Sequence, residues 1–182
     1  MIDFSLLTDR EPIMIHLKYF FSFFIIFFIV GCTESPNDTS AIEESPAIDT
    51  DSPEYAAIVF RQALLQVIAY KSGSVRNMAD GEIAIDEEKF AKDANDLDAA
   101  VNMLVDGFIE GSSRDSYPNS FASPDIWSNW DDFLEKANNL KTATAEVNQL
   151  AMTGGFVAAQ TAAQELGSNC GACHRPYRIR ND

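Results

Sequence analysis

Four stretches of the chain repeat apolar residues every three or four positions, the spacing of one face of an α-helix. Joints rich in Gly, Pro, Ser and Asp separate them, and no stretch alternates apolar and polar residues as a half-buried strand would. Two joints are short and one is long, so the pattern predicts an all-α, antiparallel four-helix bundle. The predicted helices are residues 53–71 (with a break at 72–74 and a short continuation to 78), 86–108, 124–152 and 156–178.

The residues before the first helix follow a different pattern. Residues 19–31 are almost all Phe, Ile and Val, a run shorter than the roughly 20 residues of a membrane-spanning helix. The run is typical of the apolar core of a signal peptide, and it ends in Ile-Val-Gly-Cys32, which resembles a bacterial lipobox. We therefore expect residues 1–31 to be a lipoprotein signal peptide and Cys32 to carry the lipid. Acidic residues before Met14 are unusual in such a segment, which indicates Met14 as the true start.

A disordered tether is expected between the lipid and the bundle. Residues 32–52 are rich in Ser, Thr, Pro, Asp and Glu and show no apolar periodicity, so they cannot bury enough surface to order themselves. This tether disfavours the alternative in which the apolar run is a buried strand that ends in an unrelated cysteine. Residues 53–182 are then the folded domain.

Charge excludes several classes of partner. The formal net charge is -15, and removal of residues 1–31 changes it by a single unit. Such acidity argues against nucleic acid and against electrostatic adhesion to anionic lipid. Membrane contact would therefore come from the acyl chains on Cys32, and the localisation expected is periplasmic and membrane-anchored.

Two of the three cysteines form the most informative motif. Cys170-Gly-Ala-Cys173-His174 matches the c-type haem attachment sequence. On a helix the three side chains share one face, so two thiols can bond the vinyl groups of one haem c while the His174 imidazole binds its iron. A thioredoxin-like redox pair would follow a strand, a zinc site would need a fourth ligand, and a disulfide across two residues is strained. The sequence therefore favours haem attachment.

The chain offers few candidates for a second ligand on the other side of the iron. Eight residues follow His174 and none is Met, while the second histidine of the chain, His16, lies in the predicted signal peptide. The remaining candidates are a lysine or one of three methionines, each of which is on general grounds more typical of core or loop filling. In an antiparallel bundle the first helix lies beside the last, and its middle offers Leu64 and Leu65. We therefore expect five-coordinate iron with an apolar distal pocket. The methionines are Met78, Met103 and Met152.

Three segments together resemble the cytochrome c′ family, high-spin four-helix haem proteins of bacterial periplasms. They are residues 60–65 (Phe-Arg-Gln-Ala-Leu-Leu), residues 124–127 (Pro-Asp-Ile-Trp) and residues 170–178, and the resemblance extends over about 53–178. It implies that Leu65 covers the distal face, that Arg61 lies near a haem propionate and that Arg178 lies beside His174. Related low-spin proteins carry a methionine on the first helix, and Leu65 keeps this chain with the high-spin group.

Two aromatic residues in these segments, Trp127 and Tyr177, fit either a haem contact or plain core packing. The resemblance also implies antiparallel dimers through the first two helices, for which Val59, Val67 and Ala100 would supply contacts.

An apolar pocket on open ferrous iron favours neutral diatomic gases that need no hydrogen bond, and family members bind NO and CO. Binding of NO and CO, with electron exchange with redox partner proteins, is therefore the expected function. The alternative is a dedicated electron-transfer cytochrome of a respiratory chain. An enzyme, such as a weak peroxidase, is disfavoured because no distal His or Arg pair is evident.

Overall fold

The computed structural model describes residues 48–180, which fold into helices joined by turns and loops. The predicted signal peptide, Cys32 and most of the predicted tether lie outside the described residues. In chain order the elements are α1 (Pro53–Ala79), α2 (Glu87–Asn102), the 3₁₀ helix η1 (Leu104–Gly107), α3 (Asp125–Ser128), α4 (Trp130–Met152) and α5 (Phe156–Tyr177).

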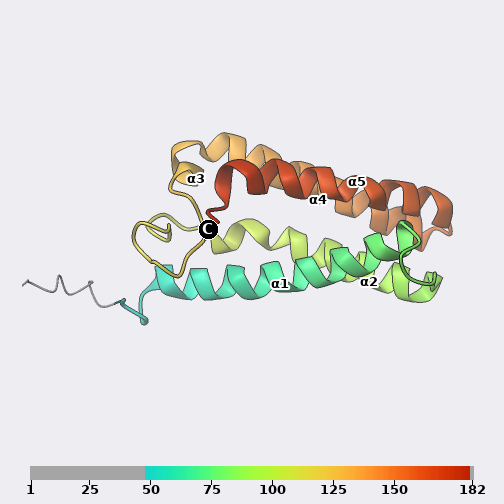
Figure 1. Cartoon of the computed structure of the whole chain (residues 1–182), viewed down its shortest axis with the longest axis horizontal. Helices are drawn as coiled ribbons and strands as arrows, with labels where there is room; N and C mark the ends of the chain where they lie inside the picture. Colours follow the sequence, from blue (N-terminus) through green and yellow to red (C-terminus); the bar gives the residue numbers. More distant parts are fainter. Residues whose placement is uncertain (1–47, 181–182) are drawn as a thin grey trace, which may run out of the picture. The chain divides into compact units, whose positions relative to one another are not determined.

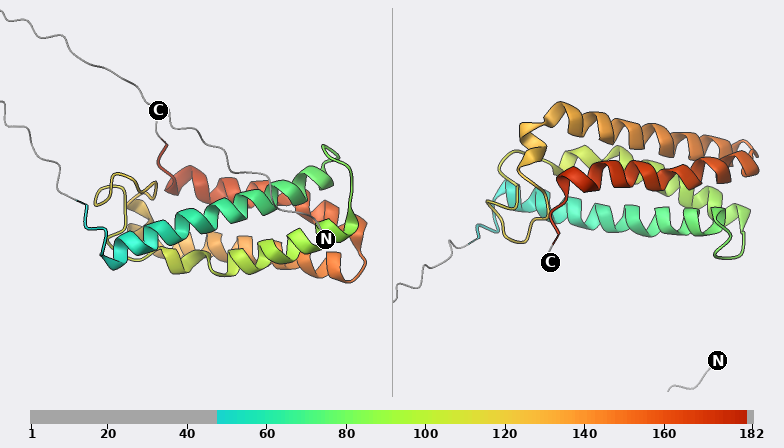
Figure 2. Two further views of the ribbon diagram at one scale, coloured as in Figure 1. Left: turned by 90° about the horizontal axis from the view of Figure 1, so that it is seen from below. Right: turned by 45° about the horizontal axis from the view of Figure 1, so that its top comes forward.

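The four long helices lie side by side, and neighbours run in opposite directions (Figures 1 and 2). α1 packs against α2 and α5, and α4 packs against the same two helices. The turns that join α1 to α2 and α4 to α5 lie at one end of the bundle (Figure 1). The other end, termed the loop end, holds η1, the 108–124 connection, α3 and the last turn of α5. The predicted antiparallel four-helix bundle is confirmed.

α1 begins where the sequence predicts and ends later. The Ser52 hydroxyl accepts a hydrogen bond from the Tyr55 backbone N–H at 3.1 Å, and Pro53 occupies the first turn. The predicted break at 72–74 is wrong, because one continuous helix runs to Ala79.

Contacts with α2 account for this continuity. The Asp93 side chain of α2 is buried, and it accepts hydrogen bonds from Lys71 at 2.6 Å and from Ser74 at 2.7 Å. Tertiary contacts of this kind override the weak helical preference of a Ser-Gly-Ser segment.

The other predicted boundaries need smaller corrections. The second helix ends at Asn102 and tightens into η1 rather than running to residue 108. The third predicted helix is divided at Asn129, whose backbone leaves the helical region (φ -128°, ψ 46°) while its side chain donates to the Asp125 carbonyl. The last helix ends at Tyr177, one residue before the predicted end.

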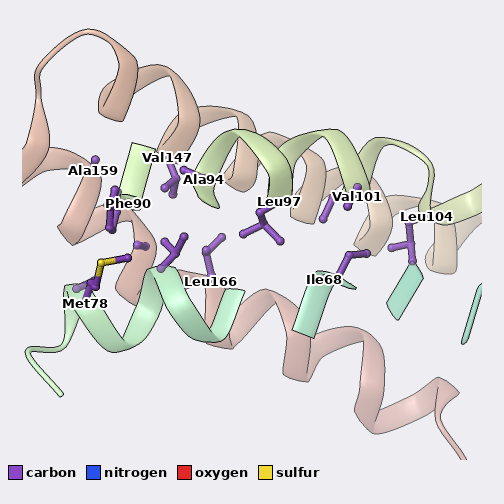
Figure 3. Packing of buried hydrophobic residues seen from close by; sticks show 14 of the residues in the cluster. Ile68, Met78, Phe90, Ala94, Leu97, Val101, Leu104, Val147, Ala159 and Leu166 are labelled. Carbon is purple, nitrogen blue, oxygen red and sulfur yellow. The ribbon is translucent and has the colours of Figure 1, made fainter. Parts of the chain in front are cut away.

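Two apolar clusters hold the bundle together. The larger one runs along the bundle axis, where Phe90 and Leu97 of α2 meet Ile68 of α1 and Leu166 of α5 (Figure 3). The smaller one lies at the loop end, and Phe108 packs against both. The buried members of the smaller cluster are Ala122, Ile126, Phe133 and Tyr177. Within residues 48–180, no helix has both the length and the apolar character that a bilayer crossing requires.

Candidate functional site

Cys170, Cys173 and His174 lie near the C-terminal end of α5, at the loop end of the bundle (Figure 1). Their spacing on the helix puts the three side chains on one face, as the attachment motif requires. Both thiols are half-buried and neither forms a disulfide. Cys173 packs against the smaller apolar cluster, so the motif lies where α5 meets α3 and the start of α4.

Burial dominates the electrostatics of this motif. It raises the pKa of the Cys170 thiol and of the Cys173 thiol above their ordinary values. His174 is exposed at the surface, and partial desolvation and then the positive charges of Arg178 and Arg180 lower its pKa. At neutral pH the thiols are therefore protonated and the imidazole is neutral, the form whose ring nitrogen has a lone pair for a metal ion.

Leu65 lies on α1, the helix that packs against α5, and its side chain is half-buried against the larger apolar cluster. The three candidate methionines lie elsewhere. Met78 is fully buried in the last turn of α1, and Met152 is 70% exposed in the last turn of α4, both at the end of the bundle opposite the motif. Met103 follows α2 near the loop end, but its side chain is 42% exposed.

Arg61 lies one helical turn before Leu65 and is buried, with only 3% of its surface exposed. Its two terminal nitrogens donate four hydrogen bonds to the segment that follows α2. Nη1 donates to the Gly107 carbonyl at 2.9 Å and to the Ser112 hydroxyl at 2.6 Å. Nη2 donates to the Ser112 carbonyl and to the Ser120 hydroxyl at 2.7 Å. These four bonds fasten the loop to the first third of α1.

All the acceptors of Arg61 are neutral oxygens, and no carboxylate of residues 48–180 pairs with it. Burial lowers its pKa to about 10, so the guanidinium is charged at neutral pH. The Phe108 ring lies under this cation, with the guanidinium carbon 5.1 Å from the ring centroid. The loop end therefore contains a buried positive charge that the described part of the chain does not neutralise.

Tyr177 is buried at the end of α5. Its hydroxyl donates to the Asp132 carboxylate of α4, and its ring packs edge-on to Phe133, with centroids 5.6 Å apart. Burial and the adjacent carboxylate raise the pKa of Tyr177 to about 12, so it is a proton donor at all ordinary pH values. Lys136 pairs with the same carboxylate at 2.6 Å. Tyr177 thus links the last turn of α5, which follows His174, with the start of α4.

Trp127 packs against the smaller cluster, and Arg178 directly follows its member Tyr177. Trp127 is half-buried in α3, and its indole Nε1–H is covered from solvent with no acceptor among residues 48–180. Arg178 is exposed, its backbone N–H donates to the His174 carbonyl, and it forms an isolated antiparallel bridge with Ala122. The backbone of Arg178 therefore closes the last turn of α5 after His174, and a role of its side chain beside the haem stays a prediction.

Several residues of this site were not predicted as such from the sequence. Phe108 was expected to lie on an apolar helix face and instead joins the two clusters under Arg61. Ser112 and Ser120 belong to the long polar joint before the third predicted helix, and the sequence pattern did not single out Asp132. Their partners lie 45 to 59 residues away in the sequence, and no local pattern signals such pairs.

The residues present fit a covalently bound haem. Two half-buried free thiols and a neutral imidazole share one helix face and match two vinyl groups and an iron. The unneutralised Arg61 cation and the unpaired Trp127 N–H lie at the same end, where they match the negative, hydrogen-bond-accepting carboxylates of the haem. Cys170, Cys173 and His174 would hold the group, and Leu65 would border it from α1.

Comparison with known proteins gives the same indication. A family model described as Cytochrome C′ matches residues 56–178. Cytochrome c-554 of Cereibacter sphaeroides is 34% identical over 122 residues, which cover 66% of this chain and 91% of the relative. Cytochrome c′ of Halomonas halodenitrificans is 32% identical over 125 residues, which cover 67% of this chain and 95% of the relative.

A solved structure has the same fold. The nitric oxide complex of a variant of cytochrome c prime from Alcaligenes xylosoxidans superposes with a TM-score of 0.62, covering 70% of this chain and 97% of that one. The two chains are 21% identical, so this likeness concerns the fold alone.

Proposed function

Since the chain belongs to the cytochrome c′ family, whose members carry haem c, we propose that it binds small diatomic gases, NO and CO, at five-coordinate, high-spin iron. The Alcaligenes protein of the same fold is known as a nitric oxide complex, which is the reason for naming NO in this proposal. Bound haem supplies an iron centre that takes a diatomic ligand and exchanges one electron. The chain itself decides which positions on that iron are filled.

The observation that carries the proposal is the placement of Leu65. The helix that packs beside the His174 helix offers a half-buried aliphatic side chain, with neither a lone pair for iron nor an N–H for a bound gas. Met78 and Met152 lie at the opposite end of the bundle, and Met103 is largely in solvent. A gas that gains little from a hydrogen-bond donor, such as NO or CO, suits such a pocket better than O₂.

Optical spectroscopy tests the proposal. The isolated, haem-loaded protein should give a high-spin spectrum, and the reduced form should bind CO and NO with a change of the Soret band. A six-coordinate, low-spin spectrum with a Met–iron charge-transfer band, unchanged by CO, would show that the site is closed.

A dedicated electron-transfer role is the second candidate. The relatives include proteins named cytochrome c-554, and the proposed alternative is transfer between respiratory complexes. Measurement of the reduction potential and stopped-flow exchange with a periplasmic electron donor would separate the two roles. Rapid exchange that CO does not inhibit would favour the carrier.

We do not propose an enzymatic role. A peroxidase needs polar groups that act on a bound oxidant, and Arg61, the buried arginine of α1, already donates its terminal N–H groups to the loop.

For location, we propose the periplasm, with membrane anchoring through Cys32. The apolar run and lipobox-like ending of residues 19–32 support this, and they lie outside the described residues. Incorporation of radiolabelled palmitate into wild type and its loss in Cys32→Ser would test the anchor. Label retained in Cys32→Ser would contradict it.

For assembly, we propose a dimer through α1 and α2. Val59 and Val67 of α1 are 49% and 46% exposed and remain candidates for the contact. Ala100 was a wrong choice, because it is buried in the larger cluster and cannot reach a partner. Analytical ultracentrifugation of the wild type and of a Val67→Glu variant would show whether this face mediates association.

A further inference from the structure

The indole N–H of Trp127 is an unusual feature of the loop end. A buried donor without an acceptor is unfavourable, and buried tryptophan N–H groups usually have a partner. Among residues 48–180, three side-chain nitrogen or oxygen atoms are covered from solvent and unpaired, and this is one of them. Trp127 and Cys173 both pack against the smaller cluster, so the free donor belongs to a residue on the same cluster as one predicted attachment thiol.

The buried side chains of Arg61 and Tyr177 at the loop end already use their polar atoms in hydrogen bonds. Each of the four terminal N–H positions of Arg61 is used by the 107–120 segment. The Tyr177 hydroxyl donates to Asp132. Arg61 can therefore contribute its positive charge, but new hydrogen bonds from its terminal nitrogens would require the loop bonds to break. Trp127 has a buried donor that requires no such exchange.

We propose that Trp127 Nε1–H donates a hydrogen bond to a haem propionate in the loaded protein, and that Arg61 acts there as the loop clamp and as a source of positive potential. This inference deepens the proposed function and rests on it for a haem attached at Cys170 and Cys173. A carboxylate acceptor suits the donor because hydrogen bonds to ionised acceptors are roughly twice as strong as neutral ones. Trp127 is in this sense a positioning residue: it acts on the haem periphery and not on a bound gas.

Trp130 provides a matched control. It is the other tryptophan of the chain, lies three residues later, and stacks on Phe133 with ring centroids 5.4 Å apart. Trp127→Phe and Trp130→Phe each remove one indole N–H from the same region and keep an aromatic ring. A comparison of the two variants therefore separates the effect of the hydrogen bond from the effect of the smaller ring.

The test uses the haem-loaded full chain. Resonance Raman spectra of the reduced protein should show a shifted propionate bending band in Trp127→Phe and an unchanged band in Trp130→Phe. The reduction potential should fall in Trp127→Phe only, because a carboxylate without its donor keeps more negative charge near the iron and stabilises the oxidised state. A propionate band and a potential that match the wild type in Trp127→Phe would overturn the proposal.

A measurement on the wild type keeps the test decisive if Trp127→Phe does not load haem. In a crystal structure of the loaded wild type, Nε1 should lie within hydrogen-bond distance of a propionate oxygen. A water molecule alone on Nε1 would refute the inference. A low-spin, CO-insensitive spectrum would contradict the proposed function. The propionate band and the reduction potential could still be measured on such a protein, so failure of the proposed function and failure of this inference are distinguishable.

Discussion

At the scale of single residues, the proposed open iron site rests on what Leu65 lacks. His174 carries a neutral imidazole on α5, and the helix packed beside it offers at Leu65 an aliphatic side chain with no ligand atom. Methionine has nearly the same volume as leucine and adds a thioether, so this exchange changes ligand chemistry with little change in packing.

Leu65→Met is expected to convert the optical spectrum from high-spin to low-spin. If Leu65 borders the iron position that we propose is open, the thioether would bind there, and CO binding to the reduced protein should slow down because this ligand would have to leave first. Absorption spectra and CO stopped-flow traces of the loaded variant measure both effects.

The control is Leu64→Met, one position earlier. Leu64 is 7% exposed and belongs to the larger cluster, so its thioether should stay in the core and the spectrum should remain high-spin. If Leu65→Met kept a high-spin spectrum with unchanged CO rates, Leu65 would not border the iron.

At the scale of the elements, two glycines near α1 differ in how closely other atoms pack against them. Gly73 lies within α1, and a Cβ built there would have no atom within 4 Å. Gly107 ends η1, and a Cβ there would lie 2.5 Å from the Arg61 Cβ. Only the second glycine is needed for close packing, and it allows Arg61 to reach the loop oxygens.

Gly73→Ala should stabilise the protein by about 0.5–1 kcal/mol, because alanine loses less backbone entropy within a helix. Gly107→Ala should destabilise it by about 1–3 kcal/mol through overpacking against Arg61. Denaturant unfolding of the two loaded variants, monitored by far-UV circular dichroism, gives both values. A destabilising Gly73→Ala would mean that α1 does break at residues 72–74.

At the scale of the whole molecule, charge is the dominant property. The formal net charge is -15, yet the contact between α1 and α2 contains a compact group of opposite charges around the buried Asp93. Burial opposes ionisation of this carboxyl, but hydrogen bonds from Lys71, Lys89 and Ser74 outweigh it and lower its pKa to about 2. The carboxylate therefore links two helices at neutral pH in a chain that is otherwise self-repelling.

The Asp93 group should make stability dependent on acid. Because its folded pKa lies below the ordinary value of 3.8, its contribution is present above about pH 4 and is lost as the pH falls towards 2. Asp93→Asn should cost about 2 kcal/mol at pH 7, and the difference from wild type should disappear near pH 2. Urea unfolding at a series of pH values measures this.

Asp96→Asn is the comparison for Asp93. Asp96 also pairs with Lys71, but its side chain is 31% exposed and screened by solvent, so its loss should cost less than the loss of Asp93. Equal losses for the two variants would contradict a special role for the buried carboxylate.

The sequence by itself determined the features that depend on short-range spacing. Helical periodicity predicted the four long helices, and the spacing of Cys170, Cys173 and His174 indicated the cofactor and its attachment, because residues three and four apart share a helix face whatever the fold. The absence of a break at residues 72–74 could not be predicted, since a buried carboxylate on α2 overrides the local preference of α1 there.

Only the tertiary structure decided how the loop end is built. Arg61 reaches Gly107 and Ser120 across 46 and 59 residues, and Tyr177 reaches Asp132 across 45. Such pairs leave no periodic signal, because they depend on which helices become neighbours and how far each loop folds back. The unpaired N–H of Trp127 is likewise invisible in the sequence, since burial and the lack of an acceptor exist only once α3, α4 and α5 have packed.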